Sequence, residues 1–279
     1  MSDGLTRVSD GVVLYDKPDG VTSHDVVARI RRALGGRTGG PGRVRVGHAG
    51  TLDPFATGLL LILVGRATRV QRFLMELPKT YEATARFGAV STTGDPEGEI
   101  TVTGVVPEGE LTLPIGLLRQ RPPAYSAVKI AGRRAYALAR AGETVELAER
   151  EVFVYRFEER RREGDRRSFT IECSSGTYVR SLIADLGDAY CEELRRTRIG
   201  PFAVADADPE RIVALGDALS FLPEVRLDRE RARRAAHGGA VPGEAGSAPV
   251  VRLIDEDGVV ALAEGRPGGM LAPVVGLRG

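Results

Sequence analysis

The sequence has little of several residue types that define whole classes of protein. Its 279 residues include two cysteines, three histidines and no tryptophan. Two cysteines without metal-site spacing argue against a disulfide-built mini-protein and a Cys/His zinc module. The longest aliphatic run, residues 59–64, is far shorter than the roughly 20 residues that cross a bilayer, and residues 1–10 contain no apolar signal-peptide core. We therefore expect a cytoplasmic globular protein with no membrane partner.

Lysine is also scarce, since three of the 39 basic residues are lysines and the other 36 are arginines. A coding bias toward arginine accounts for that number but not for where the charges lie. Residues 29–72 hold nine arginines and a single acid, Asp53, while residues 111–142 hold six cations and no acid. These two segments predict a positive surface that suits a polyanion such as nucleic acid, with solvated basic faces as the alternative.

The hydrophobic patterns predict an α+β protein, because strands dominate without a βαβα alternation. A capping box formed by Thr22 and Asp25 begins a helix that ends at Gly35. Residues 36–42 form a Gly/Arg loop, and residues 91–99 form a polar turn. A second helix is expected over residues 178–186. Strands are expected at 12–15, 81–88, 152–157 and 168–173, the last two joined by a charged connector at 158–167.

The character of the chain changes near Pro223. A short basic helix is expected at 228–237, a Gly/Pro/Ala linker at 238–249, and a hairpin at 250–263 around a turn at 255–258. We predict a main domain over residues 1–222 and a small β-rich module over 223–279. The module should pack on the main domain, because so few residues are marginal for independent folding.

Residues 47–58 form the densest unusual segment, Gly-His-Ala-Gly-Thr-Leu-Asp-Pro-Phe-Ala-Thr-Gly. Its three glycines allow close backbone approach, and Pro54 stiffens the loop after the carboxylate. Nearby arginines favour the ionised form of Asp53, which is then available as a nucleophile or base. An ordinary turn or helix-cap aspartate before proline is the alternative, and spacing alone leaves both open.

Six blocks of the chain resemble, in the same order, the motifs of the bacterial tRNA pseudouridine-55 synthases of the TruB type. Residues 47–60 resemble the catalytic motif, and Lys79-Thr80-Tyr81 resembles the substrate-stacking tyrosine motif. The other blocks are residues 11–25, 122–136, 173–182 and 194–198, and together the blocks cover most of residues 11–202. One departure is the segment between Gly187 and Leu194, which is shorter than the family pattern.

The resemblance implies a pseudouridine-synthase fold, with a central mixed and largely antiparallel sheet flanked by helices. It also implies an isomerase that breaks the N-glycosidic bond of a uridine in the T-arm loop of tRNA, rotates the base and rejoins it through carbon 5. The tRNA would be the partner of a monomeric enzyme, and neither a cofactor nor a metal is implied.

The resemblance also implies roles for individual residues. Asp53 would be the nucleophile, attacking either the ribose or the base. Tyr81 would stack on the flipped base and could transfer a proton, and Arg180 would pair with Asp53. Flipping removes a base from its stack, and an aromatic face partly replaces the lost stacking. The residues expected to bind substrate are Lys17, His48, Lys129, Tyr178 and Leu194.

Two other functions remain open from the sequence. One is an RNA-binding or RNA-chaperone protein, which would use the basic segments and tyrosines but would not need Asp53. The other is a pseudouridine synthase that acts on another RNA. A glycosidase is disfavoured, because that chemistry uses two carboxylates placed together and the segment around Asp53 contains one.

Overall fold

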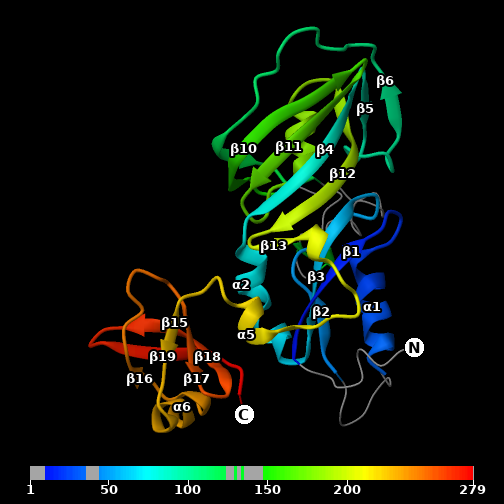
Figure 1. Ribbon diagram of the computed structural model, residues 1–279. Helices are drawn as coiled ribbons and strands as arrows, with labels where there is room; N and C mark the ends of the chain where they lie inside the picture. Colours follow the sequence, from blue (N-terminus) through cyan, green and yellow to red (C-terminus); the bar gives the residue numbers. More distant parts are fainter. Residues whose placement is uncertain (1–9, 36–43, 124–128, 131–132, 135–146, 279) are drawn as a thin grey trace.

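The structure is a computed structural model that describes residues 10–35, 44–123, 129–130, 133–134 and 147–278. The chain forms a large sheet with helices around it and a smaller sheet near the C-terminus (Figure 1). The Gly/Arg loop expected at 36–42 lies outside the described residues, as does most of the block at 122–136. No helix among the described residues is long and apolar enough to cross a membrane.

The large sheet confirms the expected mixed, largely antiparallel arrangement. Its order is β14-β1-β3-β12-β4-β11-β10-β7, with β2 paired to β3 and β13 paired to β12, and the pairing of β3 with β12 is parallel. The strands are β1 (Gly11–Lys17), β2 (Val46–His48), β3 (Thr57–Val64), β4 (Lys79–Phe87), β7 (Gly116–Gln120), β10 (Arg150–Glu163), β11 (Arg166–Cys173), β12 (Ala189–Ile199), β13 (Phe202–Ala203) and β14 (Val213–Ala214).

Helices and short hairpins surround this sheet. The predicted capping box is confirmed, since the Thr22 side chain accepts from the Asp25 amide and Asp25 accepts from the Thr22 amide. The helices are α1 (Ser23–Ala33), η1 (Gly65–Val70), α2 (Gln71–Glu76), α4 (Val179–Ala184), η2 (Val204–Asp206) and α5 (Leu215–Ala218); the hairpins pair β5 (Ala89–Ser91) with β6 (Ile100–Val102) and β8 (Lys129–Ile130) with β9 (Arg133–Arg134).

The two faces of the large sheet differ in burial. Along β4, Tyr81 and Ala83 are buried while Glu82 and Thr84 point to the opposite face. The buried face packs against Leu52 and against Leu182 of α4 in one hydrophobic cluster. This packing brings the segment around Asp53 against the first turn of α4.

The prediction of a charged connector at 158–167 is wrong. β10 and β11 run through it as one antiparallel hairpin that turns at Gly164, where φ is +60°. The charged side chains are compatible with strands because most of them are exposed, as in the Arg161–Glu163 pair at 3.1 Å, and the buried Arg167 pairs with Glu159 at 3.2 Å. The second predicted helix is shorter than expected, since α4 spans six residues.

The C-terminal segment forms its own five-stranded sheet, in the order β15-β17-β18-β19-β16. Val250 and Leu262 pack in the same hydrophobic cluster as Leu63 of β3, so this segment rests on the large sheet as expected. The division at 222/223 stays a prediction. The elements are β15 (Glu224–Arg226), α6 (Arg229–Ala236), β16 (Val241–Pro242), β17 (Val251–Asp255), β18 (Gly258–Arg266) and β19 (Met270–Gly276), so the predicted basic helix and hairpin are confirmed.

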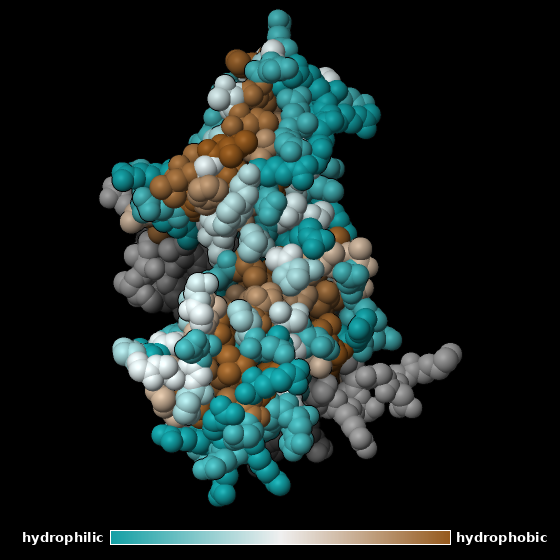
Figure 2. All heavy atoms as spheres, turned by 60° about the vertical axis from the view of Figure 1, so that its left-hand side comes forward, coloured by the Kyte–Doolittle hydropathy of each residue, from teal (hydrophilic) through white to brown (hydrophobic). Residues whose placement is uncertain are grey.

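An apolar strip is exposed on the upper part of the molecule, where β10 and β7 lie (Figure 2). Phe153 and Tyr155 of β10 are exposed with their rings 4.9 Å apart, and Leu117 of β7 lies opposite Phe153. These side chains face away from the cluster that contains Leu52.

Candidate active site

Asp53 lies in the loop between β2 and β3. This loop depends on Gly58, whose φ is +102° and whose Cβ, if it had one, would lie 2.3 Å from the carbonyl oxygen of Arg196. Glycine therefore permits the close parallel approach of β3 to β12. The Ala56 amide donates to the Asp53 carbonyl at 3.1 Å, which turns the chain back just after the carboxylate.

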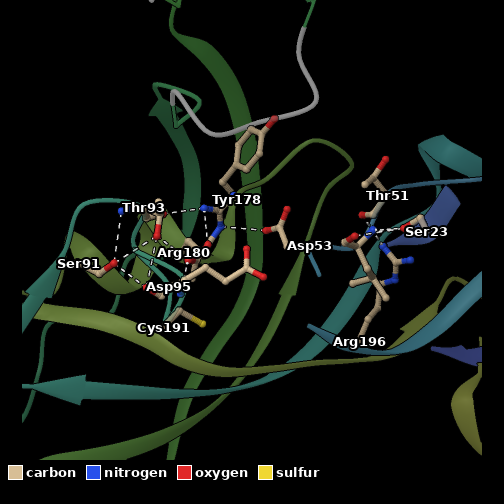
Figure 3. Close-up of polar contacts among 12 residues, drawn as sticks. Ser23, Thr51, Asp53, Ser91, Thr93, Asp95, Tyr178, Arg180, Cys191 and Arg196 are labelled. Carbon is tan, nitrogen blue, oxygen red and sulfur yellow. Dashed lines mark hydrogen bonds and ion pairs between the residues drawn. The ribbon is translucent and has the colours of Figure 1, made fainter. Parts of the chain in front are cut away.

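One arginine joins two carboxylates at this site (Figure 3). Arg180, in the first turn of α4, places its Nε 2.9 Å from Asp53 Oδ2. Its Nη1 lies 2.8 Å from Asp95 Oδ2 and donates to the Thr93 carbonyl at 2.6 Å. The Arg180 and Asp95 side chains are buried, whereas 33% of the Asp53 side chain is exposed. The carboxylate that can meet a ligand is therefore Asp53.

The titration of Asp53 differs from the sequence-based expectation. Burial is the largest influence and raises the pKa of Asp53 above its ordinary value. Arg180 opposes this by favouring the carboxylate, and the nearby Asp95 raises the pKa further. The cationic surroundings reduce the effect of burial but do not outweigh it.

Asp53 opens into a pocket of about 300 Å³. Three residues expected at the site, Tyr81, Tyr178 and Leu194, line the same pocket. Tyr81 and Leu194 come from the adjacent strands β4 and β12, and Tyr178 is the residue just before α4. The pocket is at the small end of the usual range, and its wall combines these two tyrosines and Leu194 with polar and cationic side chains. Such a pocket suits a single planar base extruded from its stack.

Tyr178 is fixed from two sides. The Gln120 side chain donates to the Tyr178 carbonyl at 2.9 Å and accepts from the Tyr178 amide at 2.7 Å. The Arg150 guanidinium lies 4.7 Å from the centre of the Tyr178 ring and bonds the Gly176 carbonyl. The Gln120 amide thus makes the two hydrogen bonds to the Tyr178 main chain that a neighbouring strand would make, while the Arg150 guanidinium stacks on the Tyr178 ring.

Lys17 holds the backbone rather than facing the pocket. Its side chain is fully buried, and Nζ donates to the carbonyls of Pro18, Val21 and Pro54 at 2.8 to 3.0 Å. All three ammonium hydrogens therefore have main-chain acceptors. We interpret Lys17 as a residue that secures the Asp53 loop, which corrects its expected role as a substrate contact.

The other two residues expected to contact the substrate are His48 and Lys129, and their roles stay predictions. His48 ends β2, where its ring lies 5.7 Å from that of His24 and its carbonyl accepts from Gln71. Lys129 belongs to β8, and its side chain lies outside the described residues. Among the residues that the structure describes, no group of three His, Cys, Asp or Glu side chains could hold a metal ion.

A larger hollow of about 1130 Å³ lies beside Leu194 and does not include Asp53. Polar side chains that line this hollow bond one another. Arg166 donates to Glu192 at 2.6 Å, and Thr84 donates to Glu193 at 3.1 Å. Glu192 and Glu193, the two acids of the shortened segment before Leu194, therefore both have partners within the protein. Of these two hollows, the smaller one contains Asp53 and is the candidate active site.

Sequence reasoning missed Asp95 and Gln120. Asp95 lies in the polar turn predicted at 91–99, where an aspartate needs no special explanation. Gln120 lies inside the basic segment 111–142, and nothing local shows that its amide reaches Tyr178. Arg196 belongs to the block at 194–198, where the resemblance implies no role for it, although strand alternation places it on the same face as Leu194.

Comparison with solved structures agrees with the fold. A chain in the crystal structure of a Cbf5–Nop10–Gar1 complex superposes with a TM-score of 0.68 at 29% identity, over 94% of this chain and 80% of that one. A chain in the structure of an H/ACA RNP bound to a substrate RNA containing 2′-deoxyuridine gives 0.68 at 26% identity, over 96% of this chain and 85% of that one. The fold is that of the pseudouridine synthases.

The sequence comparisons identify the family. Residues 39–179 match the N-terminal domain of the TruB family pseudouridylate synthases. The tRNA pseudouridine synthase B of Thermobifida fusca (strain YX) is 43% identical over 96% of this chain and 99% of its own length. That of Nocardia farcinica (strain IFM 10152) is 46% identical over 81% of this chain and 75% of its own. The chain belongs to the TruB family of pseudouridine synthases, which are isomerases.

Proposed function

We propose that this enzyme converts the T-loop uridine of tRNA, position 55, to pseudouridine, with Asp53 as the nucleophile. The observation that carries the proposal is the Asp53 carboxylate, held by buried Arg180 and partly exposed at a pocket lined by Tyr81, Tyr178 and Leu194. A uridine flipped out of the T loop would enter this pocket and stack on Tyr81.

The reaction is an isomerisation whose atoms balance within the nucleotide. The bond from C1′ to N1 breaks and a bond from C1′ to C5 forms. The C5 hydrogen leaves as a proton, and N1 gains a proton. Asp53 would act on the ribose or on the base while the uracil rotates, and Arg180 would hold the carboxylate in place during both bond changes.

The C-terminal segment would add a contact with the tRNA outside the T loop. Helix α6 carries exposed arginines at 229, 233 and 234, and its N-terminal Asp228 already pairs with Arg231. Exposed guanidinium groups on one helix are suited to phosphate oxygens. We propose that the enzyme works as a monomer on cytoplasmic tRNA.

Mapping pseudouridine on an unmodified tRNA transcript tests the proposal. Carbodiimide-dependent primer-extension stops should appear at the T-loop uridine with the wild type and not with Asp53→Asn. The matched control is Asp255→Asn, which alters another arginine-paired aspartate, bonded to Arg278 at 2.7 Å in the C-terminal sheet. That variant should keep the stop.

The other outcomes separate the alternatives. Tight tRNA binding without any stop would favour an RNA-remodelling protein. Stops in ribosomal RNA but not in tRNA would favour an enzyme for another RNA. Either result contradicts the proposed function.

A further inference from the structure

We propose that Arg196 is a positioning residue for the isomerisation, which fixes the main chain of the loop that carries Asp53. The proposal rests on the proposed function, because it assigns Arg196 an effect on the chemistry attributed to Asp53. Arg196 belongs to β12, two residues beyond the pocket residue Leu194.

The Arg196 guanidinium inserts into the Asp53 loop and bonds its main chain at three points. Its Nε donates to the Leu59 carbonyl at 2.7 Å, Nη2 to the Gly50 carbonyl at 3.1 Å and Nη1 to the Thr51 carbonyl at 3.4 Å. The side chain is 1% exposed. Figure 3 shows it directed at Thr51 with Ser23 beside it. A single rigid guanidinium therefore joins both sides of the loop.

Other buried side chains complete the fixation. Ser23 Oγ accepts from the Leu52 amide at 2.9 Å and donates to the Leu52 carbonyl at 3.2 Å, and Lys17 bonds the Pro54 carbonyl at 3.0 Å. The main chain on either side of Asp53 is thus bonded to side chains from three separate elements. Such support sets the direction in which the carboxylate leaves the loop.

Arg196 also connects the loop to the stacking residue. Arg196 lies opposite Tyr81 in the pairing of β12 with β4, and both side chains line the pocket that contains Asp53. Burial raises the pKa of Tyr81, and the charge and hydrogen bond of Arg196 oppose that rise. The same group therefore fixes two residues, one that would attack and one that would hold the base. Its cost is a buried cation, which the carbonyl acceptors offset.

A role in positioning predicts a loss of rate without a loss of affinity. Arg196→Lys keeps the charge but cannot reach three carbonyls from one planar group, so Asp53 and Tyr81 lose their fixed geometry. Displacements of about 1 Å at a reacting group lower rates by about 10²-fold. Arg196 lines the pocket but is 1% exposed and uses its donors on the loop carbonyls, so the dissociation constant for tRNA should change less than about twofold.

The experiment measures single-turnover release of tritium from tRNA labelled at uridine C5, together with the dissociation constant for tRNA. Arg196→Lys and Arg196→Gln are compared with Arg167→Lys, with rates corrected for the folded fraction. Arg167 is the matched control, because it is also 1% exposed and bonds the carbonyls of Pro107 and Gly109, but in a different part of the sheet.

The proposal predicts slow release with normal affinity in the folded Arg196 variants, and a normal rate in folded Arg167→Lys. Release at the wild-type rate in either folded Arg196 variant contradicts it, as does an equal loss of rate in Arg167→Lys. A wild-type protein that binds tRNA and releases no tritium would instead contradict the proposed function.

Discussion

Arg180 and Asp53 form an ion pair whose two sides differ in exposure. The arginine is 3% exposed and the carboxylate 33%, with Nε and Oδ2 2.9 Å apart. Arg180 is itself held by Asp95 and by the Thr93 carbonyl, so the cation is fixed before any ligand arrives. The anion is thereby oriented toward the pocket. This asymmetry is typical of a reactive group on a preorganised support.

Removing the Arg180 charge should lower the rate of isomerisation more than the affinity for tRNA. Arg180→Gln leaves Asp53 without its cation. We expect the rate of isomerisation to fall by at least about 10²-fold, with little change in tRNA binding. Single-turnover rates and filter binding measure the two effects. Equal losses in both would make Arg180 a phosphate contact.

The acid side of the pH–rate profile should move in the same variant. Burial already raises the pKa of Asp53 above 3.8, and Arg180 is the main group that opposes the rise. The reaction needs the carboxylate, so the rate falls as the pH drops through this pKa. Without Arg180 the pKa rises further, and the acid limb should shift to higher pH. A limb that stays in place contradicts Asp53 as the titrating group.

Asp95 should affect the rate of isomerisation mainly through Arg180. Asp95→Asn removes one of the two carboxylates that hold the guanidinium but leaves Asp53 in place. We expect an intermediate loss of rate, about tenfold, and normal tRNA affinity. A double variant with Arg180→Gln should be no slower than Arg180→Gln alone, since both changes act on one unit. Additive losses would show that Asp95 acts independently.

Asp95 and Arg180 illustrate which contacts could not be predicted from the sequence. Thr22 and Asp25 could be read as a helix cap because the cap is local, and the hairpin turning at Gly258 could be read for the same reason. Asp95 and Arg180 are 85 positions apart, and only the packing of α4 on the sheet brings them together. Lys17 was expected to contact the substrate on the family resemblance alone, whereas its side chain is buried and bonds three main-chain carbonyls.

Lys79 should leave a signature in stability rather than in catalysis. Burial lowers its pKa from 10.5 to about 8, and Nζ bonds the Leu77 carbonyl at 2.6 Å. Between these values the unfolded chain binds the proton more tightly, so stability rises with pH. Relative to Lys79→Met, the wild type should gain about 2 kcal/mol between pH 8 and pH 10. Urea unfolding at each pH measures this, and parallel curves for the two proteins contradict it.

Binding of tRNA should weaken steeply with salt, and α6 should contribute to the slope. Each arginine that contacts a phosphate adds about 0.9 to the slope of log affinity against log salt. Arg233→Gln should therefore lower the slope by about one. The control is Arg226→Gln, whose arginine already pairs with Glu224 at 3.1 Å in the same module. An unchanged slope in Arg233→Gln would contradict the assignment of α6 to the RNA-binding surface.

The most direct test of the account is the rate of C5 tritium release by Asp53→Asn, measured beside its affinity for the same tRNA. The variant replaces one carboxylate oxygen by an amide and keeps the loop bonds made by the main chain. The account predicts a loss of at least about 10³-fold in rate, with the dissociation constant within about twofold of the wild type. Release at a rate near that of the wild type would contradict it.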